Sequence, residues 1–261
     1  MSLGSEHKPR GQRFGLAVAL VLLLVPLSSL AYALGRDDAV EVRRVQVGKD
    51  DEEARPKAAE RLSWEVRKRT SIETSLSPSS VRLDDPSIFR SPLLYWSSDR
   101  AFATLSDKEI TGLRRFVEYG GFIIIDDAAP EAGGFDASVR RALLRAFPGE
   151  RLARLPADHT IFRSFYLLDR PAGRVADPGY VEVIMHAGRA AVIYSRLDLG
   201  GAWVAGDDRG DSLYAITPGG AAQRETAVRF GVNLVMYALC LDYKDDQVHA
   251  PFILRRRAVR P

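Results

Sequence analysis

Residues 105–127 read LSDKEITGLRRFVEYGGFIIIDD, and this stretch decides the fold class. Ser106 and Glu109 form the capping-box pattern with which a helix begins. Apolar residues then recur at helical spacing until Gly120-Gly121, a pair that favours the left-handed turn at a helix end. Residues 122–125 follow at once as a wholly apolar run, which is typical of a strand buried on both faces. A helix that leads into such a strand predicts a βαβ unit and a parallel sheet.

The rest of the chain extends this pattern in both directions. The other expected elements are strands over 40–47, 81–83, 93–96 and 151–155, a helix ending at about Lys68, a helix from Asp136 or Ser138 to Phe147, a β-hairpin over 181–185 and 190–194, and a final helix over 221–241. The second half of the final helix is apolar nearly all round and must be buried. The sequence therefore predicts an α/β fold with a late hairpin and a buried C-terminal helix.

Composition restricts the class of protein and of partner. The chain has 261 residues, of which 46% are hydrophobic and 27% charged, the balance of a folded protein. Residues 1–33 carry three basic residues and one acidic residue, so the remainder has 34 basic and 33 acidic side chains. So small a net charge argues against nucleic-acid binding, which requires many phosphate contacts. The basic tail from about Arg255 is interpreted as a solvated end.

The amino terminus has the pattern of a secretory signal peptide. A basic stretch through Arg13 precedes the apolar run 14–27, and Ala31-Tyr32-Ala33 supplies the A-x-A cleavage pattern. We predict cleavage after Ala33, which would leave residues 34–261 as a single α/β domain in the periplasm or another extracytoplasmic space. The alternative is an uncleaved anchor in the inner membrane formed by residues 14–34, and it would be the only attachment to a membrane.

Several motifs together resemble a bacterial protein family. They are Ser91-Pro92-Leu93-Leu94-Tyr95-Trp96, Leu113-Arg114-Arg115-Phe116, Gly120-Gly121 with the strand to Asp126-Asp127, Asp158-His159, and the stretch from Asn233 through Tyr243-Lys244. From about Val42 to Leu254 the chain resembles the family called domain of unknown function 4159. The resemblance implies a three-layer, flavodoxin-like sheet similar to that of class I glutamine amidotransferases.

The resemblance also implies partners and one departure. Relatives are often found beside membrane proteins with von Willebrand-type modules and beside MoxR-type ATPases, which suggests partners in the cell envelope. Relatives often carry a Gly-His pair after the strand that ends at Trp96, whereas this chain has Ser98-Asp99. Any family chemistry that needs that imidazole is therefore in doubt for this chain.

Polar residues that follow the predicted parallel strands are the candidate ligand-binding residues. In open α/β sheets, ligands bind beyond the carboxyl ends of the strands, where Ser98, Asp99, Asp126 and Asp127 are expected. Two adjacent carboxylates can coordinate a divalent cation or act as acid and base. His159, on a later loop, would complete a metal site with Asp126 and Asp127 if that loop folded back over the strand ends. The structural alternative is that these residues cap turns or face solvent.

Amidotransferase chemistry is not expected. It needs a thiolate at a strand-to-helix turn, but the residues after the apolar strand are Asp126-Asp127-Ala128-Ala129. Cys240, the only cysteine, falls in the apolar final helix and is interpreted as buried and inert. The sequence therefore favours a non-catalytic module that binds a small ligand or an envelope protein. The rival is a metal-dependent hydrolase that uses Asp126, Asp127 and His159.

Overall fold

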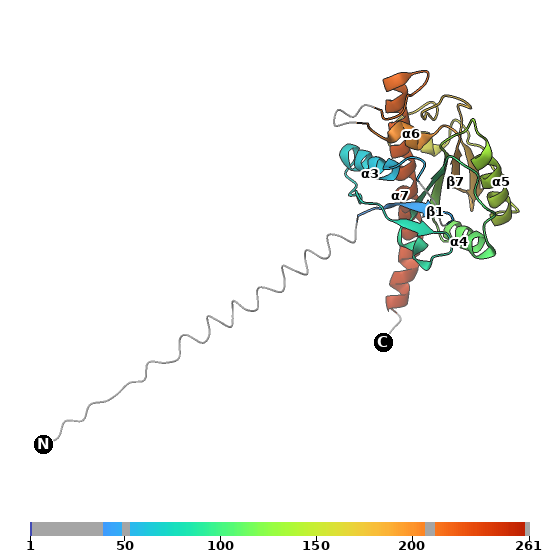
Figure 1. The fold of residues 1–261 in the computed structure, drawn as a ribbon. Coiled ribbons are helices and arrows are strands. Elements are labelled where there is room, and N and C mark those ends of the chain that lie inside the picture. Colours follow the sequence, from blue (N-terminus) through green and yellow to red (C-terminus); the bar gives the residue numbers. More distant parts are fainter. Residues whose placement is uncertain (2–38, 49–52, 207–211, 259–261) are drawn as a thin grey trace. The chain divides into compact units, whose positions relative to one another are not determined.

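The central sheet contains seven strands in the order β2-β1-β3-β4-β7-β6-β5 (Figure 1). The computed structural model describes Met1 and residues 39–48, 53–206 and 212–258. The strands are β1 (Val42–Gln46), β2 (Ser80–Arg82), β3 (Leu93–Ser98), β4 (Phe122–Asp127), β5 (Ala153–Arg154), β6 (Glu182–His186) and β7 (Arg189–Ser195). The first five in spatial order pair in parallel, and β6 and β5 pair antiparallel. The predicted parallel sheet and late hairpin are confirmed.

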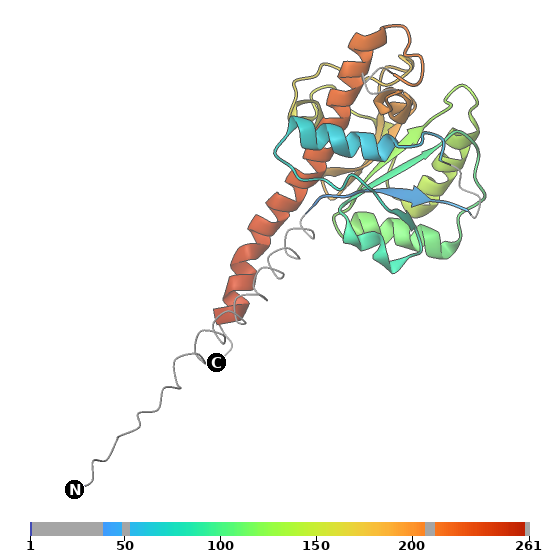
Figure 2. The ribbon, with the colours of Figure 1, turned by 60° about the vertical axis from the view of Figure 1, so that its left-hand side comes forward.

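Helices cover both faces of the sheet (Figure 2). The helices are α3 (Ala58–Arg69), α4 (Asp107–Glu118), α5 (Gly134–Ala146), α6 (Leu199–Trp203) and α7 (Gly220–Ala258), with the 3-10 helices η1 (Pro86–Arg90) and η2 (Thr160–Arg163). One apolar core joins the sheet to α3, α6 and α7, and the other joins it to α4 and α5. The result is a mixed seven-stranded α/β sheet between two helical layers.

Local signals fix the βαβ unit as expected. The Ser106 hydroxyl accepts a hydrogen bond from the Glu109 amide, and the Glu109 carboxylate accepts one from the Ser106 amide, so α4 begins with a complete capping box. Gly120 has φ of +103° after the last helical turn. Gly112 lies against β2, because an added Cβ would come 1.8 Å from the carbonyl oxygen of Leu83. The close approach of α4 to the chain after β2 therefore requires glycine.

The final helix differs from its prediction. It extends through Ala258, well beyond the expected end at Leu241, and its buried stretch ends at Ala238. Cys240 is exposed, so its interpretation as a buried thiol is wrong. None of the helices formed by the described residues has the length and apolarity that crossing a membrane requires.

Asn233 ties α7 to the loop after η2. Its side-chain oxygen accepts a hydrogen bond from the Tyr166 amide at 2.7 Å, and its amide nitrogen donates to the carbonyls of Ile161 and Tyr166. Both the oxygen and the nitrogen of this buried amide are hydrogen-bonded, so Asn233 is a structural tether. Residues Val40–Pro261 form one compact unit, and the predicted signal segment lies outside the described residues.

Candidate functional site

The carboxyl ends of β3, β4 and β7 bring several predicted residues to one edge of the sheet. Ser98 lies opposite Asp127 in the register of β3 and β4, and Asp126 lies beside Ser195 of β7. Successive residues of a strand point to opposite faces. Asp126 therefore faces α6, whereas Asp127 faces the layer of α4 and α5. The two adjacent carboxylates do not share a site.

Asp126 is an internal cap for α6. Its carboxylate accepts hydrogen bonds from the Leu199 and Gly200 amides, both at 2.8 Å, and from the Tyr95 hydroxyl at 3.0 Å. Burial and, after it, the nearby Asp198 carboxylate raise the pKa of Asp126 to about 7, although the backbone hydrogen bonds oppose the shift. Both carboxylate oxygens are used within the fold.

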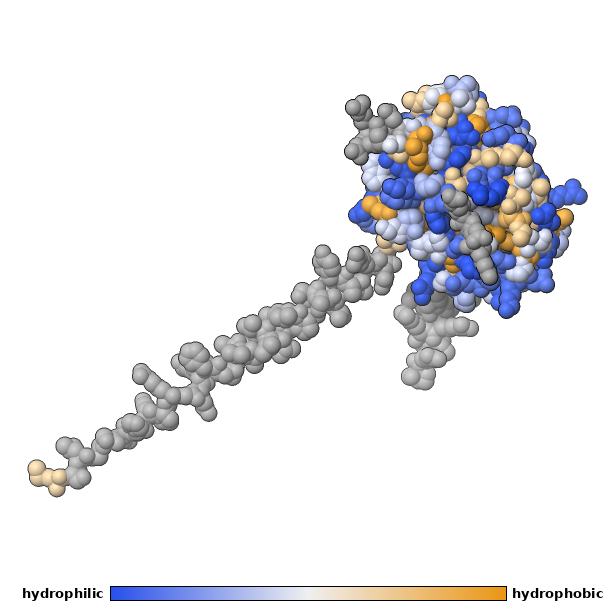
Figure 3. All heavy atoms as spheres, viewed as in Figure 1, coloured by the Kyte–Doolittle hydropathy of each residue, from blue (hydrophilic) through white to orange (hydrophobic). Residues whose placement is uncertain are grey.

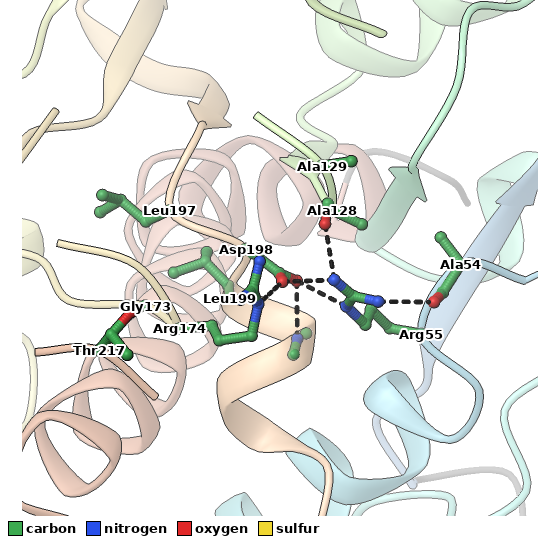
Figure 4. A network of polar contacts seen from close by, with 12 residues as sticks. Ala54, Arg55, Ala128, Ala129, Gly173, Arg174, Leu197, Asp198, Leu199 and Thr217 are labelled. Carbon is green, nitrogen blue, oxygen red and sulfur yellow. Dashed lines mark hydrogen bonds and ion pairs between the residues drawn. The ribbon is translucent and has the colours of Figure 1, made fainter. Parts of the chain in front are cut away.

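Asp198 is the centre of a buried ionic network (Figure 4). The Arg55 guanidinium donates to both of its oxygens, at 2.9 and 2.6 Å, and Arg174 donates to one of them from the opposite side. Asp198 also caps α6, because it accepts a hydrogen bond from the Gly201 amide at 3.0 Å. Arg55 reaches further, to the Ala128 carbonyl at 2.6 Å, and so ties the start of α3 to the chain after β4.

Sequence reasoning missed this network and α6 itself. No helix was expected over 199–203, although an aspartate directly before Leu199 is a helix-start signal. Arg55 and Arg174 are far from Asp198 in the chain, so no local pattern joins them.

Asp127, unlike Asp126, has a carboxylate that is only partly hydrogen-bonded. Its Oδ1 accepts a hydrogen bond from the Ala129 amide at 3.0 Å, whereas its Oδ2 is buried without a hydrogen-bond partner among the described residues. Burial raises the pKa of Asp127 to about 6, and the Arg196 guanidinium partly offsets that effect. A carboxylate in this state costs stability when it is ionised.

We predict that Asp127→Asn stabilises the protein at alkaline pH. A pKa raised in the folded state contributes stability that is present below the unfolded pKa and lost as pH rises through the folded value, here about 6. When the pH rises from 5 to 8, the free energy of unfolding of the variant should therefore increase by roughly 1 kcal/mol relative to that of the wild type. Urea unfolding at both pH values measures it, and a gain independent of pH would contradict it. Asp99→Asn is the control with no such gain, because pairing with Arg100 lowers the pKa of Asp99.

Ser98 and Asp99 form the turn after β3. The Ser98 hydroxyl accepts a hydrogen bond from the Arg100 amide and donates one to the Arg100 carbonyl, at 3.3 and 3.2 Å. Asp99 forms an ion pair with Arg100 at 2.7 Å. Both residues therefore lie at the predicted edge of the sheet, where their polar atoms stabilise the local turn.

His159 lies at the other end of the sheet. It caps η2 by accepting a hydrogen bond from the Ile161 amide at 3.2 Å, and its ring packs on Tyr237. Tyr237 contacts Phe122, the first residue of β4, which is four residues or about 13 Å along the strand from Asp126. Burial lowers the pKa of His159. The structure therefore does not bring His159 together with Asp126 and Asp127.

Metal-ligand geometry agrees with this separation. Within the described part of the chain, no group of three His, Cys, Asp or Glu side chains is placed to hold a metal ion. The proposed set of Asp126, Asp127 and His159 is divided between two faces and two ends of the sheet. Its residues would have to move through the core to meet.

Comparison with known proteins identifies the family. A family model described as "Domain of unknown function (DUF4159)" matches residues 41–239. The chain belongs to this family. No curated protein matches it.

The DUF4159 match includes every strand and ends in the buried part of α7. Both polar networks at the strand ends, around Asp126 and Asp198 and around Asp127, are therefore inside the DUF4159 domain. The first network holds its elements together, and the second leaves buried polar atoms unpaired. At the strand ends, the polar groups on the α6 face are hydrogen-bonded within the fold. On the face of α4 and α5, some buried polar atoms of the described residues have no hydrogen-bond partner.

Proposed function

We propose that this DUF4159 domain is a non-catalytic module that binds a protein partner along the groove between η1 and α4. Phe89 and Tyr119 carry the proposal. Their side chains are 45% and 72% exposed, and their ring centroids lie 5.5 Å apart. Exposed aromatic pairs of this kind are characteristic of the central contacts in protein interfaces.

Two cavities flank Phe89. The first, of about 410 Å³, lies between η1 and the first turns of α4, and the second, of about 360 Å³, lies between the end of η1 and Gly120-Gly121. Both are within the size range of binding sites, and Phe89 lines both. A partner that places apolar side chains on either side of Phe89 would bury both aromatic rings. Apolar residues elsewhere on the face in Figure 3 form small patches among polar ones.

The strand ends support a non-catalytic role. Asp126 and Asp198, two fully buried carboxylates there, hold α6, α3 and the sheet together. We further propose that the fold is of the flavodoxin-like, class I glutamine amidotransferase-like kind. The parallel strands β2-β1-β3-β4-β7 support this assignment, because their order reverses between β1 and β3 as in doubly wound sheets. The residue after Ile125 is aspartate, where an amidotransferase nucleophile would be a cysteine.

The site of action is proposed from the sequence. A signal peptide over residues 1–33 would export the protein to the periplasm. The partner would then be an envelope protein, with von Willebrand-type membrane proteins and MoxR-type ATPase systems as the first candidates because of the family resemblance.

Substitution at the aromatic pair tests the proposal. Phe89→Asp combined with Tyr119→Asp should reduce co-purification of such a candidate partner at least tenfold, because two carboxylates would be buried in an apolar interface. Leu144→Asp is the matched control, since Leu144 is 68% exposed on α5 and lies outside both cavities. Equal capture by the double variant and the control, with both folded by circular dichroism, would reject the groove as the binding surface.

A further inference from the structure

Three residues form a row across the carboxyl ends of β3, β4 and β7. Ser98 pairs with Asp127, and Ser195 pairs with Asp126, so Arg196 continues the row beside Asp127. Alternation along each strand directs these three side chains to the face covered by α4 and α5. Adjacent strands lie about 4.8 Å apart, so Asp127 is flanked by side chains within reach of one shared ligand.

Two atoms of this row have unused hydrogen-bonding capacity. Among the described residues, neither Asp127 Oδ2 nor Arg196 Nε has a hydrogen-bond partner, and both atoms are buried. Arg196 Nε lies 4.0 Å from Asp136 Oδ1, which is too far for a hydrogen bond. A buried acceptor and a buried donor thus follow each other on neighbouring strands, at the edge where α/β sheets bind ligands.

Asp136 and Arg140, the two charged residues of α5 near this row, are paired. Asp136 accepts hydrogen bonds from the Tyr194 hydroxyl and Arg140 Nε, both at 2.9 Å, and Arg140 also pairs with Glu182. An anionic ligand would meet the Asp127 carboxylate, and a cationic ligand would meet the Arg196 guanidinium. Opposite charges side by side therefore favour a neutral ligand that donates to one and accepts from the other.

We propose that Asp127 and Arg196 form a binding site for a sugar or polyol through a pair of adjacent hydroxyl groups. One hydroxyl donates to Asp127 Oδ2, and its neighbour accepts from Arg196 Nε–H. This site lies outside the groove of η1 and α4, so the inference is independent of the proposed partner interface.

Residues 128–133 cover the site. Arg196 Nη2 donates to the Pro130 carbonyl at 3.4 Å, a long and therefore weak hydrogen bond. Glu131, Ala132 and Gly133 are exposed. Because Asp127 Oδ2 is buried, the ligand enters when this segment moves away from Arg196.

Saturation-transfer NMR on the purified full chain tests the proposal. The probes are myo-inositol and D-glucose, which carry adjacent hydroxyls, with acetamide, acetate and guanidinium as neutral, anionic and cationic comparisons. Asp127→Asn and Arg196→Met should each weaken binding of the polyols at least about tenfold, because each removes a charge-assisted hydrogen bond. Glu60→Gln is the matched control, because it removes a carboxylate charge from the exposed surface of α3, on the other face of the sheet, and should leave binding unchanged.

Each result has a defined meaning. Polyol binding to the wild type and to Glu60→Gln, with the tenfold loss in the other two variants, supports the proposal. Binding of acetamide or a charged probe in place of the polyols overturns the ligand class. If no probe binds, or if Asp127→Asn binds as the wild type does, the unpaired atoms hold a buried water only and the proposal fails. Circular dichroism spectra that match the wild type, with melting temperatures no lower than that of the wild type, exclude misfolding as the cause of a loss.

Discussion

Asp198→Ala is expected to lower the free energy of unfolding by about 3 to 5 kcal/mol. The change leaves the half-buried guanidinium groups of Arg55 and Arg174 without their shared, fully buried carboxylate, and it removes the hydrogen bond to the Gly201 amide. Breaking a buried ion pair from one side costs far more than the pair contributes as a whole, because the remaining charges stay desolvated. Urea unfolding at pH 7 measures the loss.

A second variant separates charge from capping. Asp198→Asn retains an oxygen for the Gly201 amide but removes the negative charge, so its loss should be smaller than that of Asp198→Ala. The exposed pair of Asp99 and Arg100 provides the control, because Asp99→Ala should cost less than about 1 kcal/mol. A loss of that small size for Asp198→Ala would show that the network does not stabilise the fold.

Asp126→Ala is expected to be the other strongly destabilising change, with a loss of about 3 kcal/mol or more. It leaves the Leu199 amide, the Gly200 amide and the Tyr95 hydroxyl buried without their acceptor, and each unpaired group costs about 1 to 3 kcal/mol. The comparison with Asp127→Asn at pH 8 is decisive. Asp126→Ala should lower the free energy of unfolding there, whereas Asp127→Asn should raise it. Equal losses at both positions would contradict the division of the two carboxylates between the faces.

Elements with strong local signals were predictable from the sequence. Three signals act over only a few residues, so each determines its own element. They are the capping box of α4, the apolar run of β4 and the glycine between β6 and β7. The start of α5 was missed, because Gly133 occupies its N-cap without a side-chain hydrogen bond. The end of α7 was also missed, because the helix continues to Ala258 through the polar residues that follow Leu241.

The candidate site was predictable only in part. Its position at the strand ends follows from the parallel sheet, and Ser98, Asp99, Asp126 and Asp127 do lie there. The strand period of two already implied that Asp126 and Asp127 face opposite sides, whereas the position of His159 depends on η2 packing against α7. Arg196 was missed because its role depends on the pairing of β7 with β4, which no local pattern reveals.

The carboxylate at the start of α6 also affects how the protein responds to salts in solution. Backbone amides at a helix start attract phosphate and sulfate, yet here the amides of Leu199 and Gly200 already bind Asp126. The Asp126 carboxylate therefore occupies the position that an anion from solution would take. Phosphate and sulfate should thus not bind at the start of α6 and should act on the domain only as general cosolutes. Crystallisation or storage in phosphate should leave the hydrogen bonds of Asp126 in place.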